Sequence, residues 1–258
     1  MTLLRARFSC VVVAALSLAT LIGCGGGNSG TPAARKAPGK PVDAATTGTV
    51  SGRVTLSGKA PVMHAIDMSA EPSCAKQYNA PVIPPTVVED TQGNLANAVV
   101  YVESGTEQYE FRAPTEPAHM TQKGCMYEPH VVALMAGQKL DVANDDQAIH
   151  NVFVMSKDNQ PSNRSSTPGS APVEDVMTVP ERAIPVKCNV HPWMKGYVFV
   201  FDHPFFAVTK PDGTFELSGL PAGTYTITAW QESFGTTQQT VNVSAKQNAT
   251  ANFEFKAQ

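Results

Sequence analysis

The stretch Cys188-Asn189-Val190-His191-Pro192-Trp193-Met194 places a thiol, an imidazole and a thioether within seven residues. Thiolate and thioether ligands favour Cu(I), whereas imidazole accepts copper in both oxidation states. A trigonal copper site with two histidines, one cysteine and a weak axial methionine needs a second histidine from elsewhere. His150 is the best candidate, because residues 148–154 are apolar and β-branched and so predict a strand. The predicted ligands are His150, Cys188, His191 and Met194.

The pattern Cys-x-x-His-Pro-aromatic-Met-basic-Gly, followed by a Val/Phe strand, resembles the ligand loop of the amicyanins, which are cupredoxins. The run His150-Asn151-Val152 resembles their upstream ligand strand, and the separation of 38 residues between His150 and Cys188 is of the cupredoxin kind. The resemblance covers residues 106–202. It implies a Greek-key β-sandwich that holds one type 1 copper and passes single electrons between redox proteins.

Three neighbours complete the predicted site. Asn151 resembles the cupredoxin asparagine that braces the ligand loop by hydrogen bonds; a polar residue on a strand edge is the alternative. Pro192 fixes the backbone after His191 and removes an N–H group. Trp193 is predicted to shield the metal or to form an apolar docking surface, and packing in an ordinary core is the alternative.

Other interpretations of the loop are open at this point. Met and free Cys are common core fillers, so each ligand taken singly fits a packing role. Zinc is a second alternative, although structural zinc takes four Cys or His ligands and Met is not among them. The remaining histidines are predicted to be surface or packing residues: His64, His119, His130 and His203.

The N-terminus has the pattern of an export signal. Arg5 and Arg7 precede an apolar stretch, residues 8–22, that is too short to span a membrane comfortably. The run Leu21-Ile22-Gly23-Cys24 resembles a bacterial lipobox, which implies cleavage after residues 1–23 and a lipid on Cys24. The chain is thus expected on the periplasmic face of a bacterial membrane, with the outer membrane favoured. An ordinary signal peptide is the alternative.

The five cysteines can then be assigned one by one. Cys10 leaves with the signal, Cys24 carries lipid and Cys188 binds copper. Cys74 and Cys125 remain, and an oxidising compartment favours pairing them in a disulfide. This pairing follows by elimination, and two free thiols are the alternative.

Charge and composition restrict the partners. The chain has 19 basic and 22 acidic residues, a net charge of −3, which becomes −5 when Arg5 and Arg7 leave with the signal. No basic stripe is present that could neutralise phosphates, so nucleic acid is not expected as a partner. Residues 24–47 are rich in Gly, Pro, Ala, Ser and Thr and predict a flexible tether.

A second resemblance lies near the C-terminus. Residues 212–230 read Asp-Gly-x-Phe-x-Leu-x-Gly-Leu-Pro-Ala-Gly-x-Tyr-x-Ile-x-Ala-Trp and resemble the carboxypeptidase regulatory-like domain, a transthyretin-like β-sandwich. The resemblance implies an opening strand such as residues 50–56 and a second strand such as residues 98–102. About a hundred residues, including the copper motif, then intervene. We therefore expect an all-β chain in which a cupredoxin is inserted in, or fused edge to edge with, the second sandwich. A single enlarged cupredoxin with C-terminal hairpins is the alternative.

The expected domains are a signal peptide (1–23), a tether (24–47), the first part of the regulatory-like sandwich (48–105), a cupredoxin (106–202) and the second part of that sandwich (203–258). Short apolar runs predict strands in the cupredoxin at residues 131–135, 139–142, 149–155, 184–187 and 197–201. Residues 156–182 form a long, polar stretch rich in Pro and Ser, and its composition favours a disordered loop; a functional loop that flanks the copper or a docking face is the alternative.

The sequence predicts a lipid-anchored type 1 copper protein that carries electrons and is not an enzyme. The alternatives are a non-catalytic copper carrier or a β-sandwich module that binds carbohydrate or protein. A copper enzyme is less favoured, because the sequence lacks the additional His cluster that an open catalytic copper needs.

Overall fold

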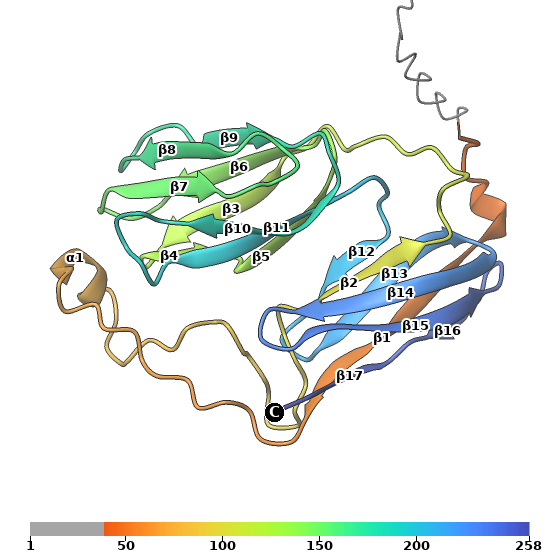
Figure 1. The fold of residues 1–258 in the computed structure, drawn as a ribbon, viewed down its shortest axis with the longest axis horizontal. Helices are drawn as coiled ribbons and strands as arrows, with labels where there is room; N and C mark the ends of the chain where they lie inside the picture. The colour runs from red at the N-terminus through yellow and green to blue at the C-terminus, as the bar shows by residue number, and fades with distance from the viewer. Residues whose placement is uncertain (1–38, 258) are drawn as a thin grey trace, which may run out of the picture. The chain divides into compact units, whose positions relative to one another are not determined.

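Seventeen strands and two short helical turns make up residues 39–257, the part of the chain that this computed structural model describes (Figure 1). The strands form four sheets, which pair into two β-sandwiches with separate hydrophobic cores. The predicted all-β class is confirmed. Among the described residues no helix is both long enough and apolar enough to cross a bilayer. Cys24, the signal and most of the predicted tether lie outside the described residues.

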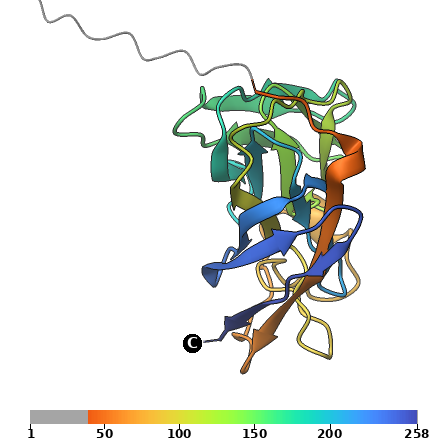
Figure 2. The ribbon, with the colours of Figure 1, turned by 90° about the vertical axis from the view of Figure 1, so that its right-hand side faces the viewer.

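The first sandwich is built from both ends of the described chain. One sheet has the order β13-β1-β16, with β17 also paired to β1; its strands are Thr214–Pro221, Thr47–Ser57, Asn248–Thr250 and Phe253–Lys256. The other has the order β12-β2-β14-β15, from Phe206–Val208, Val99–Ser104, Gly223–Gln231 and Gly235–Val243. Strand β17 runs parallel beside β1, so the last strand lies against the first (Figures 1 and 2).

The strands of this sandwich follow from their alternation. Val50, Val54 and Leu56 of β1 are buried, whereas the residues between them are partly exposed. The turn before β13 requires glycine at Gly213, which has φ 73°. A Cβ atom there would lie 2.6 Å from the Val54 carbonyl oxygen. Asp212 completes the turn by accepting a hydrogen bond from the Thr214 amide at 3.1 Å.

The second sandwich is inserted between β2 and β12. One sheet has the order β5-β11-β10-β7-β8, from Val131–Met135, Lys195–Phe201, Glu181–Lys187, His150–Val154 and Ser162–Ser166. The facing sheet has the order β4-β3-β6-β9, from Met126–Glu128, Ala118–Lys123, Lys139–Asn144 and Val173–Val176. Strands β3 to β11 have a hydrophobic core of their own. The second sandwich is therefore an insertion in the first, and the alternative of a single enlarged cupredoxin does not fit.

The predicted disorder of residues 156–182 is wrong. Strand β8 pairs with β7, and β9 pairs with β6. The two new strands are joined by an ion pair between Arg164 and Asp175 and by a hydrogen bond of 2.9 Å from the Ser162 hydroxyl to Asp175. Seven of their nine residues are polar, and Val173 is the one apolar residue of the two strands that packs into the core, so backbone pairing holds them more than apolar burial does. Composition alone cannot reveal a strand of this kind.

The predicted tether also ends earlier than residue 47. The Lys40 amide donates to the Gln108 carbonyl at 2.9 Å, and the Glu110 amide donates to the Lys40 carbonyl at 3.1 Å. A 3-10 turn, Ala44–Thr46, follows, and Asp43 caps it through the Ala45 amide. These backbone bonds order a segment whose composition predicts flexibility. The sequence also missed the short helix α1, Pro72–Ala75, and strands β3 and β4.

The two sandwiches share an aromatic cluster. It contains Val99 and Tyr101 from β2, Val131 from β5, and Phe199 and Phe201 from β11. The Trp230 ring of β14 packs edge-on against Phe199, with ring centroids 4.8 Å apart. The two cores are therefore connected by packed side chains, and not by the chain crossings alone.

Candidate metal centre

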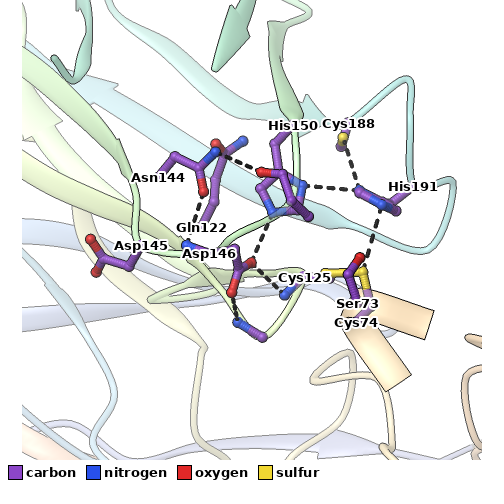
Figure 3. A network of polar contacts seen from close by, with 12 residues as sticks. Ser73, Cys74, Gln122, Cys125, Asn144, Asp145, Asp146, His150, Cys188 and His191 are labelled. Carbon is purple, nitrogen blue, oxygen red and sulfur yellow. Dashed lines mark hydrogen bonds and ion pairs between the residues drawn. A yellow bond between two sulfur atoms is a disulfide. The ribbon is translucent and has the colours of Figure 1, made fainter. Parts of the chain in front are cut away.

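His150 comes from strand β7, and the other predicted ligands come from the loop between β10 and β11. Figure 3 shows His150, Cys188 and His191. His150 is the first residue of β7, and Cys188 follows the last residue of β10. These strands pair antiparallel, with Val186 opposite Val154, which places the two ligands at the same end of the sheet. His191 and Met194 lie in the loop that follows.

Three ligand atoms converge inside the protein. The Nδ1 atoms of His150 and His191 are 2.9 Å apart, and the Cys188 Sγ atom is 3.7 Å from the His191 Nδ1 atom. The ligand atoms of this trio all lie within 4.8 Å of one another. The exposed fractions of His150, Cys188 and His191 are 0%, 4% and 1%. Two imidazole nitrogens and one sulfur thus face a common point that is shielded from water.

Met194 is held at the same place by its backbone. The Cys188 amide donates to the Met194 carbonyl at 3.1 Å, and the Met194 amide donates to the His191 carbonyl at 2.9 Å. The Met194 side chain is buried in the same apolar cluster as Cys188. These bonds close the loop tightly. The thioether as a fourth ligand stays a prediction.

The ligand loop is braced by two of its predicted neighbours. The Asn151 Oδ1 atom accepts a hydrogen bond of 3.2 Å from the Asn189 amide, so the strand that carries His150 holds the loop. The Trp193 indole donates to the Cys125 carbonyl at 3.1 Å, and its ring packs against His191 with centroids 5.2 Å apart. Pro192 is exposed. Trp193 therefore packs on the site rather than projecting from it.

Cys74 and Cys125 form a disulfide, with Cα atoms 5.6 Å apart, and Cys188 is free. The Cys74 Sγ atom lies 3.6 Å from the His191 Nε2 atom. Two other groups of potential ligands use these sulfurs: Cys74, Cys125 and His191, and Cys125, Asp146 and His150. Because disulfide sulfurs are not thiolates, the trio of His150, Cys188 and His191 is the better donor set.

The sequence missed the segment that covers His191. Cys74 belongs to α1, and the Glu71 carboxylate that precedes the helix lies 4.0 Å from the His191 Nε2 atom. The disulfide attaches this segment to Cys125, beside the site. Nothing in the local sequence relates α1 to a histidine more than a hundred residues away, apart from the leftover cysteine pair.

Asp146 is a second residue that the sequence missed. Its Oδ2 atom is 2.8 Å from the His150 Nε2 atom, and the carboxylate is buried (Figure 3). The only signal in the sequence is a carboxylate four residues before a ligand histidine. In the polar run Asn144-Asp145-Asp146 that signal is indistinguishable from an ordinary turn.

The buried charges favour a metal-binding thiolate. Burial alone lowers the pKa of His150, but hydrogen bonds with Asp146 and Cys188 raise that pKa to about 9. Burial raises the pKa of the Cys188 thiol, but the hydrogen bond with His150 and those with nearby backbone amides bring the pKa below its usual value. Burial and the neighbouring His150 charge lower the pKa of His191. The thiolate is the form of cysteine that binds metals.

The other histidines lie apart from this trio. His64 and His119 are exposed. His130 is buried and pairs with Glu232. His203 is buried, with its Nε2 atom 2.9 Å from the Val102 carbonyl oxygen.

The C-terminal part of the chain matches a known family. The match is to the carboxypeptidase regulatory-like domain, over residues 198–256. It confirms the resemblance of residues 212–230 and includes β12 to β17 of the first sandwich. No curated protein matches the chain.

Cupredoxins are among the solved structures similar to the chain, as the sequence predicts. Amicyanin from Paracoccus versutus is 19% identical, with a TM-score of 0.29, over 40% of this chain and 97% of that one. A purple cupredoxin from Nitrosopumilus maritimus is 21% identical, with a TM-score of 0.28, over 33% and 99%. A copper-containing nitrite reductase from Thermus scotoductus is 20% identical, with a TM-score of 0.32, over 40% of this chain and 25% of that one. This chain thus spans about a quarter of the reductase.

Proposed function

We propose that the chain is a type 1 copper protein that carries single electrons between redox partners. The observation that supports this most is the buried trio of two imidazole Nδ1 atoms and one cysteine sulfur at His150, Cys188 and His191. Two histidines and a cysteine, with a methionine in the same loop, are the donor set of blue copper sites. The residues present therefore fit the metal.

Bonds within the protein hold each predicted ligand residue in place. His150 is on a strand, Cys188 directly follows a strand, and the loop between Cys188 and Met194 is closed by two backbone hydrogen bonds. Asn151 fixes the loop to the His150 strand through the Asn189 amide. A bound copper would supply the one-electron couple. A donor set that is already fixed and shielded from water reduces the rearrangement that accompanies a change of charge.

The test is to load the mature protein with copper. We expect one copper per chain, an intense visible band from the Cys188 thiolate, and reversible one-electron reduction without turnover of oxygen or nitrite. Binding without colour or without reversible reduction would favour a copper carrier. Turnover of oxygen or nitrite would favour a copper enzyme.

Met194→Gln separates the axial ligand from the other three. Because an axial methionine bond is weak and long, copper and the visible band should survive while the reduction potential shifts. Cyclic voltammetry of the two copper-loaded proteins measures the shift. An unchanged potential would remove Met194 from the ligand set and would contradict a type 1 site of the proposed composition.

We also propose that Cys24 carries a lipid that anchors the exported chain to a membrane, with the outer membrane favoured. The run Leu21-Ile22-Gly23-Cys24 and its apolar stretch support this. Each buried CH2 of an acyl chain stabilises binding by about 0.8 kcal/mol, so several chains hold firmly. Cys24→Ser should release the protein from the membrane fraction and abolish incorporation of labelled fatty acid. Equal membrane retention of this variant, with no label in the wild type, would contradict the anchor.

A further inference from the structure

The carboxylate of Asp146 is built into the metal centre, although it is not one of the ligands. Asp146 is 3% exposed, and each of its oxygens accepts at least one hydrogen bond. The Oδ2 atom accepts from the Cys125 amide at 2.7 Å and lies 2.8 Å from the His150 Nε2 atom. The Oδ1 atom accepts from the Gly124 amide at 2.8 Å.

The backbone around Asp146 is shaped to hold this carboxylate. Gly124 and Cys125 both have positive φ, 63° and 55°, which turns two consecutive amides toward one acceptor. Cys125 is not a glycine, so its conformation is sparsely populated, and the disulfide to Cys74 and the bond to Asp146 both hold it. At Gly124 a Cβ atom would lie 2.1 Å from the Tyr78 hydroxyl oxygen. The two-amide cradle thus depends on these residues.

The cradle also suits a charged carboxylate. Its oxygens face the Gly124 amide, the Cys125 amide and the His150 ring nitrogen, and hydrogen bonds donated to a carboxylate favour its ionised form. A buried negative charge therefore sits in hydrogen-bond contact with a metal-ligand imidazole. A carboxylate that accepts the outer N–H of a ligand histidine fixes the ring orientation and raises the basicity of the other nitrogen.

We propose that Asp146 is a positioning residue for the copper centre, which fixes His150 with its Nδ1 atom toward the metal and stabilises Cu(II) over Cu(I). The geometry has one consistent assignment: the Nε2–H group points to Asp146, and the Nδ1 atom faces His191 at 2.9 Å. The charge near the ring favours the more positive oxidation state of the metal. The second part of this inference rests on the proposed function.

Asp146→Asn removes the charge with almost no change in shape. A carboxamide has one acceptor oxygen, whereas the carboxylate uses both of its oxygens, so at least one of the three N–H groups must face an NH2 group. The matched control is Asp145→Asn, one residue away, because the Asp145 side chain is exposed and bonded to the Thr121 hydroxyl. Any general effect of losing a charge in this loop appears in both variants.

Two measurements test the inference. In the metal-free protein, proton NMR should show a His150 Nε2–H resonance protected from exchange, and Asp146→Asn should lose the protection while Asp145→Asn keeps it. In the copper-loaded protein, Asp146→Asn should weaken copper binding about 10–100-fold. It should also reduce the preference for Cu(II) by about tenfold, which corresponds to about 59 mV for a one-electron couple.

The outcomes separate the parts of the inference. If the His150 Nε2–H of the wild-type protein exchanges freely with solvent, the positioning role is wrong. This test needs no variant, so it still applies if Asp146→Asn fails to fold. Potentials that are equal in Asp146→Asn and Asp145→Asn would overturn the electrostatic role. If the protein forms no blue copper site while the Nε2–H remains protected, the proposed function fails and the positioning of His150 stands.

Discussion

Cys188→Ser is expected to abolish the visible colour of the copper-loaded protein. The band comes from charge transfer out of the Cys188 sulfur, and a hydroxyl oxygen does not donate charge in this way. Cys188 is the one free cysteine among the described residues, so no second thiol is at hand to replace it. The loop itself should survive, since the bonds that close it are made by backbone atoms at positions 188, 191 and 194.

The measurement is an absorption spectrum during a copper titration, with Val190→Ala as the control. Val190 is 46% exposed and lies in the same loop, so its truncation should leave band and stoichiometry unchanged. His150→Ala and His191→Ala should each open the site to water or added imidazole. An unchanged spectrum in Cys188→Ser would show that the type 1 assignment is wrong, and a storage or carrier role would become the better account.

Phe199→Ala is expected to lower the free energy of unfolding of the whole described chain by about 3–5 kcal/mol, because it leaves a cavity that the surrounding core fills only in part. Phe199 is fully buried and lies in the aromatic cluster shared by the two sandwiches, in ring contact with Trp230 and Tyr101. The half-buried Phe234, in the hairpin between β14 and β15, is the control, and Phe234→Ala should cost less.

The two tryptophans make this measurement specific. Trp193 is in the ligand loop of the inserted sandwich, and Trp230 is in the first sandwich. The fluorescence of single-tryptophan variants therefore follows the unfolding of each sandwich in urea, with the metal-free protein. If the shared cluster couples the halves, the two transitions coincide and Phe199→Ala moves both. Separate midpoints, with only one of them displaced, would show that the sandwiches unfold independently.

Features that depend on certain residue types at a fixed spacing could be predicted from the sequence. The order of His150, Cys188, His191 and Met194 is specific because few sites need those four donors together. Strand β1 could be predicted because Val50, Val54 and Leu56 alternate with polar residues. The Asp-Gly turn before β13 could be predicted because few residues other than glycine tolerate the positive φ that it needs.

The features that the sequence did not predict depend on contacts with residues far away in the chain. Strand β8 is polar, and it is a strand because β7 supplies its hydrogen bonds. Asp146 differs from its neighbour Asp145 in what it faces, which is the His150 ring and the amides of Gly124 and Cys125. Such contacts are settled by tertiary packing, and no local pattern in the sequence encodes them.

The pairing of β17 with β1 has a consequence for how the protein is made. Arg53 and Asn252, which are bonded across the region where β1 meets the end of the chain, are 199 residues apart in sequence. The first sandwich is incomplete until strand β17 has been made, whereas every strand of the inserted sandwich lies between Ala118 and Phe201. Contacts between nearby segments form sooner than contacts that close a long loop. The inserted domain that carries the ligand loop is therefore expected to form before the first sandwich, which needs β16 and β17 to pair with β1.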